Sequence, residues 1–232
     1  MTEADASTRT PRSASWHGFT SELNHKLAMR AADRPFLIEL AGTPRAGKTT
    51  AMRELGRRLG ASGLHVELIE ESARCCPIPD KHHPHFNIWT FCNTLTRILA
   101  AQYTGADVVV VDRGIVDAAC WMDWYRETGS LPVEAHGDID RFVLHSLWAG
   151  QIDLVVMMKA GPAVAIERDA VGKATRTPGL IVNADTLGQF NAAIDRMHAR
   201  LARNYPLVAV ETTYMKPDEV LHDILREALS HC

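Results

Sequence analysis

The sequence predicts a three-layer α/β/α fold, in which a five-stranded parallel sheet lies between two layers of helices. Two observations support this prediction. Five short runs rich in β-branched and other apolar residues recur along the chain, and helical patterns separate them. The run at residues 108–111 consists of four consecutive valines, which is typical of a strand buried on both faces.

The strands follow from the apolar runs and from the residues that bound them. Pro35 precedes the first run, and it ends a preceding helix because proline disfavours helical geometry in the residue before it. Asp112 ends the valine run. The expected strands are 36–40, 64–69, 106–112, 153–159 and 207–211.

The helices are expected where apolar residues recur at steps of three and four. The longest stripe consists of Leu187, Phe190, Ile194, Met197 and Leu201. The last helix is expected to begin at Pro217, because proline fits the first turn of a helix. The expected helices are 16–32, 48–60, 87–102, 115–127, 138–149, one that starts at 162, 185–203 and 217–230.

The domain organisation is expected to be simple. Residues 1–14 carry Ser, Thr, Pro and charge without periodicity, which predicts a disordered tail. We expect residues 1–34 to form this tail and a short helix, and residues 35–232 to form a single domain. Ligands of such sheets bind at the carboxyl ends of the strands, so the functional residues are expected there.

A phosphate-binding motif follows the first expected strand. Residues 42–49 read Gly-Thr-Pro-Arg-Ala-Gly-Lys-Thr and fit G-x-x-x-x-G-K-[ST] at every fixed position, between a strand and a helix. Backbone N–H groups of such a P-loop point at a phosphate chain, and the following helix adds its positive end. The motif predicts a P-loop NTPase fold that binds ATP, with Lys48 on the β- and γ-phosphates and Thr49 on Mg²⁺. The expected nucleotide-binding residues are Gly42, Thr43, Pro44, Arg45, Ala46, Gly47, Lys48, Thr49 and Thr50.

The valine strand ends in Asp112, which Arg113 and Gly114 follow. A hydrophobic strand that ends in Asp is the Walker B arrangement, in which the carboxylate reaches Mg²⁺ directly or through water. The next residue is Arg113 rather than a water-activating Glu, and the sequence contains no N-K-x-D motif for guanine. The pattern favours neither a motor ATPase nor a GTPase. Thr49 and Asp112 are the expected metal residues.

Two adjacent carboxylates, Glu70 and Glu71, end the second expected strand. This is the sheet edge at which the P-loop and Asp112 are expected. One of the two is placed to accept a proton from an acceptor hydroxyl, or to hold that hydroxyl in line with the γ-phosphate. The sequence does not decide which of them does so.

A basic segment follows the fourth expected strand. Arg168 begins it, and Lys173, Arg176, Pro178 and Gly179 follow between two expected helices. Cations in such a segment are typical of a lid that covers the transferring phosphoryl group and excludes water. We expect a helical lid at about residues 168–180.

Together these residues resemble the nucleoside and nucleotide kinase group of P-loop proteins, which includes thymidylate kinases and deoxynucleoside kinases. The likeness covers about residues 36–228. It depends on the P-loop, a Glu after the second strand, the Asp112-Arg113 pair and the order helix–lid–helix. The resemblance implies that Asp112 and Arg113 contact the acceptor and the phosphates.

The resemblance also implies roles for other residues. One of Glu70 and Glu71 would be the base or the acceptor ligand, and Arg45 is similar to a P-loop arginine that reaches the transferred phosphate in one thymidylate kinase subgroup. Gly114 stands where thymidylate kinases usually carry an aromatic residue or His, and Pro44 stands where that subgroup has Asp. The acceptor therefore stays open.

The helix expected at residues 87–102 would wall the acceptor pocket in the kinases that the chain resembles. Trp89 is placed to stack on a planar ring, and Asn93, on the same helical face, is placed to hydrogen-bond its edge. Trp121, Trp124 and Tyr125 form a second aromatic cluster. The expected acceptor residues are Glu71, Trp89, Asn93 and Arg113.

Histidines and cysteines leave a smaller question open. His82, His83 and His85 lie just before this helix, and they could bind a metal or line the substrate pocket. The 5 cysteines include no C-x-x-C pair, which indicates reduced thiols rather than a disulfide framework.

Composition excludes some partners. The 25 Lys and Arg residues nearly balance 28 Asp and Glu residues, which argues against binding to nucleic acid through bulk charge. No apolar run approaches the roughly 20 residues of a membrane helix, and the first residues lack the apolar stretch of a secretory signal. We expect a cytoplasmic protein with a small-molecule acceptor and with no nucleic-acid or membrane partner. The oligomeric state is open, with a homodimer as one option.

The sequence thus predicts a Mg-ATP-dependent phosphotransferase that moves the γ-phosphoryl group to a small molecule, with a nucleoside or nucleotide as the first candidate. ATP is the default donor over GTP. One alternative is a kinase of a hydroxyl on a specialised metabolite or antibiotic, and another is a non-catalytic or regulatory P-loop switch. The expected catalytic residues are Lys48, Arg45, Glu70, Glu71, Asp112, Arg113, Arg168 and Arg176.

Overall fold

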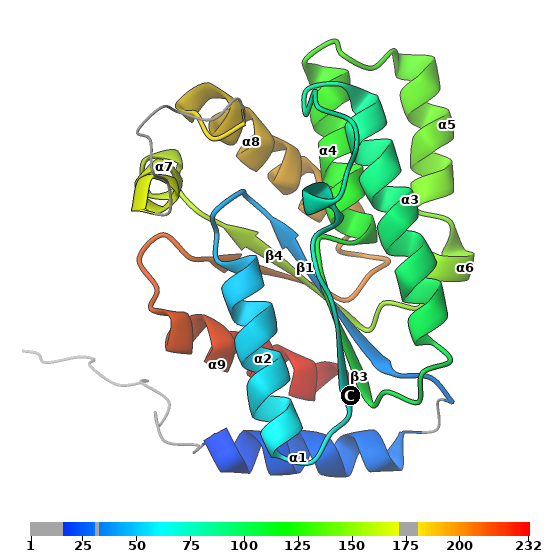
Figure 1. Cartoon of the computed structure of the whole chain (residues 1–232), viewed down its shortest axis with the longest axis vertical. Helices are drawn as coiled ribbons and strands as arrows, with labels where there is room; N and C mark the ends of the chain where they lie inside the picture. The colour runs from blue at the N-terminus through cyan, green and yellow to red at the C-terminus, as the bar shows by residue number, and fades with distance from the viewer. Residues whose placement is uncertain (1–15, 31–32, 172–180) are drawn as a thin grey trace, which may run out of the picture.

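The computed structural model describes residues 16–30, 33–171 and 181–232. Within these residues five parallel strands form one sheet in the order β2-β3-β1-β4-β5, with helices on both faces (Figure 1). The predicted three-layer α/β/α fold with a five-stranded parallel sheet is confirmed. The strands are β1 (Phe36–Gly42), β2 (Val66–Ile69), β3 (Val108–Asp112), β4 (Leu154–Lys159) and β5 (Leu207–Glu211).

Two helical layers cover the sheet. Helices α1, α2 and α9 pack together on one face, and α3, α4 and α8 cover the other, with α5 against α4 (Figure 1). The helices are α1 (Trp16–Met29), α2 (Lys48–Ala61), the 3-10 turn η1 (Ser72–Arg74), α3 (Pro84–Ala101), α4 (Ile115–Glu127), α5 (Val133–Val143), α6 (Ser146–Ala149), α7 (Pro162–Val171), α8 (Ala184–Leu201) and α9 (Pro217–His231).

Successive side chains of the central strands enter two separate cores. Leu37 and Val109 are buried with α3, α4 and α8, whereas Ile38 and Val110 are buried with α2 and α9. This alternation follows from the pleat of a strand, whose side chains point in turn to the two faces. It explains why the strands read as nearly continuous apolar runs, and it makes the one acidic residue inside β1, Glu39, conspicuous.

The bounds of one predicted helix are wrong. The helix expected at 138–149 is two helices, α5 and α6, and α5 begins earlier, at Val133. The break lies at His145, whose backbone is extended and whose side chain accepts a hydrogen bond from the N–H of Leu147. His83 caps α3 in the same way, so that this helix begins at Pro84 rather than at residue 87.

The segment before β1 joins the main core. In α1, Leu23 is fully buried and packs with residues of α2 and α9. Trp16 lies under the guanidinium of Arg58 in α2, 3.6 Å from its ring centroid. The tail expected at residues 1–14 and most of the lid expected at about 168–180 lie outside the described residues.

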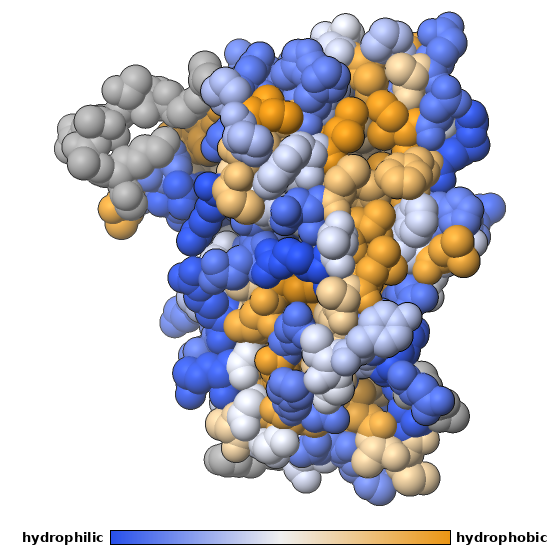
Figure 2. Space-filling model, turned by 45° about the vertical axis from the view of Figure 1, so that its right-hand side comes forward, coloured by the Kyte–Doolittle hydropathy of each residue, from blue (hydrophilic) through white to orange (hydrophobic). Residues whose placement is uncertain are grey.

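Apolar side chains also gather on the surface over α3 and α5 (Figure 2). A groove between α3, α4 and α5 has Ile88, Phe91, Ile139 and Phe142 among its lining residues. None of the helices in the described part of the chain is both long enough and apolar enough to cross a membrane.

Candidate active site

The carboxyl ends of the strands open onto a cavity of about 1180 Å³. The sheet order places β1 between β3 and β4, so the loop after β1 lies in the middle of this edge. Residues from the P-loop, from the segments after β2 and β3, and from α3, α4, α7 and α9 line the cavity. The topology therefore brings most of the predicted site into one space.

The P-loop is held between β4 and α8. A Cβ atom on Gly42 would lie 2.0 Å from the carbonyl oxygen of Met158, and the φ of Gly42 is +124°, so only glycine fits there. The N–H of Thr43 donates to the same oxygen at 2.9 Å, and the Thr43 hydroxyl donates to Asn191 of α8. Gly47, with a φ of +100°, precedes the first residue of α2.

The ammonium of Lys48 lies within the loop. Its Nζ donates to the carbonyl oxygens of Gly42 at 2.8 Å and Thr43 at 2.7 Å. Burial, together with the charge of Arg113, lowers the pKa of Lys48 to about 8. The side chain is therefore still mostly protonated at neutral pH and carries a buried positive charge in the phosphate-binding loop.

The two expected metal residues are in contact. The hydroxyl of Thr49 donates to Oδ2 of Asp112, and Oδ1 of Asp112 is buried without a hydrogen-bond partner. Burial raises the pKa of Asp112 above its usual value, although Lys48 and Thr49 act in the opposite direction. Mg²⁺ prefers oxygen ligands. A hydroxyl beside a buried carboxylate with an unsatisfied oxygen fits that requirement.

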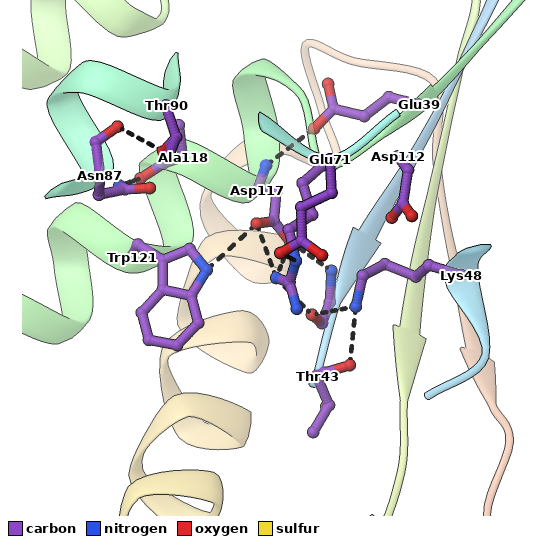
Figure 3. Close-up of polar contacts among 12 residues, drawn as sticks. Glu39, Thr43, Lys48, Glu71, Asn87, Thr90, Asp112, Asp117, Ala118 and Trp121 are labelled. Carbon is purple, nitrogen blue, oxygen red and sulfur yellow. Dashed lines mark hydrogen bonds and ion pairs between the residues drawn. The ribbon is translucent and has the colours of Figure 1, made fainter. Parts of the chain in front are cut away.

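Arg113 contacts two carboxylates, those of Glu71 and Asp117, which lie close together in Figure 3. Its Nε is 2.7 Å from Oε1 of Glu71, its Nη1 donates to Oδ2 of Asp117 at 3.0 Å, and its backbone N–H donates to Leu40. Burial acts to lower the pKa of Arg113, but Asp117 and Glu71 outweigh it and raise the pKa. Arg113 has a φ of +65°, so its backbone is in the left-handed region rather than in the helix or strand region.

The two adjacent carboxylates have different environments. Glu71 lines the cavity, whereas Glu70 is half exposed, does not line it, and pairs with Arg53 at 3.1 Å. Burial acts to raise the pKa of Glu71, and Arg113 and Lys48 bring it below its usual value. The structure therefore places Glu71, and not Glu70, beside the P-loop and Arg113.

Arg45 of the P-loop contacts α7, and Arg168 of α7 contacts the segment after β5. Nε of Arg45 donates to Asp169 at 2.7 Å, and Nη2 of Arg168 donates to the carbonyl oxygen of Thr212 at 2.8 Å. Arg45 is a non-glycine residue with a positive φ, +64°. Both arginines line the cavity. Arg176 lies outside the described residues.

The face of α3 that lines the cavity differs from the expected one. Its residues there are Phe86, Asn87, Thr90, Phe91 and Thr94. Trp89 and Asn93 are not among the lining residues, and Asn93 accepts a hydrogen bond from Ser72 instead. Trp89 and Asn93 thus belong to α3 but lie away from the side of this helix that faces the cavity.

The second aromatic cluster does contribute to the cavity. Trp121 lines it and stacks on Phe190 of α8, with ring centroids 3.8 Å apart. The Trp121 indole N–H donates to Oδ2 of Asp117 at 3.1 Å. Tyr125 also lines the cavity, and its hydroxyl donates to the carbonyl oxygen of Lys81, whereas Trp124 does not line it.

Two acidic residues of the network, Glu39 and Asp117, were missed as functional candidates. Glu39 is fully buried in β1, and its carboxylate accepts the N–H groups of Ile115 and Asp117. Asp117 accepts from Gly42, Arg113 and Trp121. A signal was available for Glu39, because a charged residue inside a strand buried on both faces requires buried partners.

The histidines before α3 have local roles. His83 caps the helix, and its ring lies against that of His85, with centroids 4.3 Å apart. The His82 ring lies 5.9 Å from Trp124. Within the described residues no group of three or more metal-binding side chains is present, and all five cysteines are free thiols.

Comparison with known proteins addresses the fold. No protein-family model matches the sequence, and no curated protein matches it. Solved structures of deoxyadenosine kinase from M. mycoides do match. With the products dCMP and a flexible dCDP bound, that kinase superposes with a TM-score of 0.66 over 84% of this chain and 100% of its own, at 17% sequence identity. With dATP bound, the values are 0.64, 83%, 98% and 15%.

The chain therefore shares the fold of these deoxyadenosine kinase structures. A third structure, of the same kinase with dCTP bound, gives a TM-score of 0.60 at 16% identity. Coverage of the solved chains is 98% or more in all three comparisons, so the shared architecture extends across the whole kinase fold.

Proposed function

We propose that this chain is a Mg-ATP-dependent kinase that transfers the γ-phosphoryl group of ATP to a hydroxyl of a nucleoside or nucleotide. The observation that carries the proposal is one cavity shared by the P-loop lysine, Lys48, and the Glu71–Arg113 ion pair. Phosphoryl transfer depends mainly on positioning and on charge stabilisation. A cationic phosphate loop beside a carboxylate–guanidinium pair supplies both.

The donor side of the cavity is built for a triphosphate. The N–H groups of the P-loop and the ammonium of Lys48 would bind the β- and γ-phosphates. Thr49 and Asp112 would hold Mg²⁺, which when bound offsets the negative charge of the phosphates. Arg45 and Arg168 extend the positive charge along the cavity wall.

The acceptor side supplies a base and a clamp. The lowered pKa of Glu71 keeps its carboxylate ionised at neutral pH, so that it can bind an acceptor hydroxyl and orient it. As the hydroxyl oxygen bonds to the γ-phosphorus, the bond from that phosphorus to the β-phosphate oxygen breaks. The hydroxyl proton passes to Glu71 and ADP leaves. Arg113 stabilises the charge on the transferring group.

The acceptor class is inferred from the wall of the cavity. Phe86 and Trp121 provide apolar ring surface, and Asn87 and Thr90 provide polar groups on the same helix as Phe86. Flat apolar surfaces with a few polar groups suit a nucleobase. The structural relatives support this choice, since they are deoxyadenosine kinases.

An acceptor screen tests the proposal. The full chain is incubated with MgATP and with deoxynucleosides, nucleosides, nucleoside monophosphates or hydroxylated natural products, and ADP release is measured. We expect a nucleoside or nucleotide to stimulate ADP release, with Lys48→Ala as the inactive control. Stimulation by a natural product alone would support the metabolite kinase instead. Tight ATP binding without stimulation by any acceptor would support the regulatory switch.

A further inference from the structure

Glu39 is a buried acidic residue that the proposed transfer step does not use. It stands in the middle of β1, is fully buried, and pairs in register with Val111 of β3 and Val155 of β4. Its side chain enters the side of the sheet that α4 covers, where it meets the beginning of that helix (Figure 3). A buried carboxyl is costly unless its oxygens are hydrogen-bonded, so its contacts indicate why it is there.

The carboxylate of Glu39 caps α4 from a neighbouring strand. Oε2 accepts the N–H of Ile115 at 3.0 Å, and Oε1 accepts the N–H of Asp117 at 2.8 Å. The first N–H groups of a helix have no partner within the helix and favour a negative charge. The residue at the N-cap position, Gly114, makes no side-chain cap of its own. Glu39 therefore supplies the cap for the first N–H groups of α4.

Gly114 makes room for this contact. A Cβ atom on Gly114 would lie 2.7 Å from Cδ of Glu39 and 2.8 Å from Oε2. The close approach of the Glu39 carboxyl therefore leaves no room for a side chain at this position. The glycine after Asp112-Arg113 is thus explained by the carboxyl that lies against it.

Asp117, whose backbone Glu39 holds, is connected to three parts of the site. Its carboxylate accepts the N–H of Gly42 at 2.7 Å, Nη1 of Arg113 at 3.0 Å and the indole N–H of Trp121 at 3.1 Å. A shift in the first turn of α4 would move the beginning of the P-loop, the guanidinium and the aromatic wall together.

We propose that Glu39 is a positioning residue for phosphoryl transfer, which fixes Asp117 through the first turn of α4 and thereby fixes Arg113. This inference rests on the proposed function, because it assumes that Arg113 acts on the transferring group. The contact from Glu39 to Asp117 can be tested without any acceptor, and the effect on transfer can be tested separately.

The variant Glu39→Gln removes one acceptor and keeps the shape. Glutamine has one acceptor oxygen, and its NH₂ group would face the other N–H of α4. The first measurement is the indole N–H resonance of Trp121 in a ¹⁵N-correlated NMR spectrum of the full chain, assigned by its loss in Trp121→Phe. We expect this resonance to shift in Glu39→Gln, because the hydrogen bond to Asp117 changes.

The second measurement is steady-state transfer from MgATP to deoxyadenosine, which serves as the probe acceptor. We expect kcat to fall by about a hundredfold, because a displacement of around 1 Å in a positioned group has such an effect. The KM for MgATP should change much less than kcat, because the P-loop is also held by the hydrogen bonds from Thr43 to Met158 and Asn191. A purely structural role of Glu39 would not lower kcat while leaving the KM for MgATP largely unchanged.

The matched control is Asp153→Asn. Asp153 also accepts a backbone N–H, that of Leu37 at 2.8 Å, but near the start of β1, far from the cavity. This variant should lose stability while kcat and the Trp121 resonance stay unchanged.

Gly114→Ala disturbs the same contact, because its added Cβ atom would lie against the Glu39 carboxyl. This variant therefore provides a second test if Glu39→Gln does not fold. As a single substitution, Gly114→Ala should lower kcat. Combined with Glu39→Ala, it should lower kcat by less than the product of the two separate fold-changes. An unchanged Trp121 resonance in the Glu39 and Gly114 variants overturns the inference, and so does a shifted resonance with wild-type kcat. If the wild-type chain transfers phosphate to no nucleoside or nucleotide, the proposed function fails, and the resonance still decides whether Glu39 holds Asp117.

Discussion

Nε of Arg113 lies 2.7 Å from Oε1 of Glu71, and this ion pair joins the segment after β2 to the segment after β3. The same guanidinium contacts Asp117 on the other side. Arg113 is thus held by two carboxylates. That of Asp117 belongs to α4 and is almost completely buried, whereas the Glu71 side chain is 30% exposed in the cavity. Under the proposed function, Glu71 is the partner that would exchange its contact for an acceptor hydroxyl.

Glu71→Gln should reduce phosphoryl transfer by about 10²- to 10⁴-fold, the usual contribution of a general base. The amide keeps the shape but cannot take the proton. The check is kcat with the acceptor that the screen identifies. Glu70→Gln is the matched control, because its carboxylate is directed to Arg53 and does not line the cavity. Equal losses in the two variants would contradict the assignment of Glu71.

Lys48→Ala should abolish measurable transfer while leaving the fold intact. Loss of one group that stabilises charge in the transition state costs about 10²- to 10³-fold in rate. The carbonyl groups that Lys48 contacts belong to a loop that lines the cavity, where water can replace the ammonium. Thermal unfolding and ADP release are the measurements. Lys26→Ala is the control, since Lys26 also donates to a backbone carbonyl, that of Leu229, but away from the site.

Trp121→Leu should raise the KM for the acceptor by about fivefold, because aromatic contacts contribute about 1 kcal/mol beyond simple burial. Trp121 of α4 lines the cavity, whereas Trp89 of α3 does not. Trp89→Leu should therefore leave the KM near the wild-type value. A larger effect for Trp89→Leu than for Trp121→Leu would restore the acceptor face that the sequence predicted.

The contribution of Glu39 to the stability of the folded chain should fall as the pH rises from about 4.5 to about 7. Burial raises the pKa of Glu39 from 4.5 to about 7, partly offset by the N–H groups of α4, with Asp117 adding to the rise. The folded state thus holds a proton that the unfolded state has already released. This contribution is complete below pH 4.5 and lost above pH 7, and it amounts to about 3 kcal/mol.

Urea unfolding at a series of pH values measures this effect. The free energy of unfolding of Glu39→Gln should lack it, so the difference between wild type and variant isolates Glu39 from the other titrating groups. Parallel pH profiles for the two proteins would show that Glu39 does not titrate in this interval.

Much of the donor half of the site was predictable from the sequence. The P-loop from Gly42 to Thr49 and the strand that ends in Asp112 are local patterns, and local patterns fix local backbone geometry. Their meeting at one sheet edge follows from the parallel order of the strands. The contact between Thr49 and Asp112 agrees with that expectation.

The acceptor half was less predictable, because it depends on rotations and contacts between distant segments. A change of one residue around α3 exchanges Trp89 for Thr90 at the cavity wall, and the sequence pattern does not resolve a step of that size. The break at His145 between α5 and α6 depends on a single cap, which periodicity does not report.

The sequence by itself determined the α/β class, the parallel sheet and the phosphate loop, since each follows from residue periodicity or from a contiguous motif. The tertiary structure alone placed Glu71 rather than Glu70 in the cavity, because adjacent residues at the end of a strand point to different surroundings. It also set the contacts of Glu39, whose hydrogen-bond partners lie 76 and 78 positions along the chain. Contacts at such separations are set by how the strands and helices pack, and that packing explains why Gly114 follows Arg113.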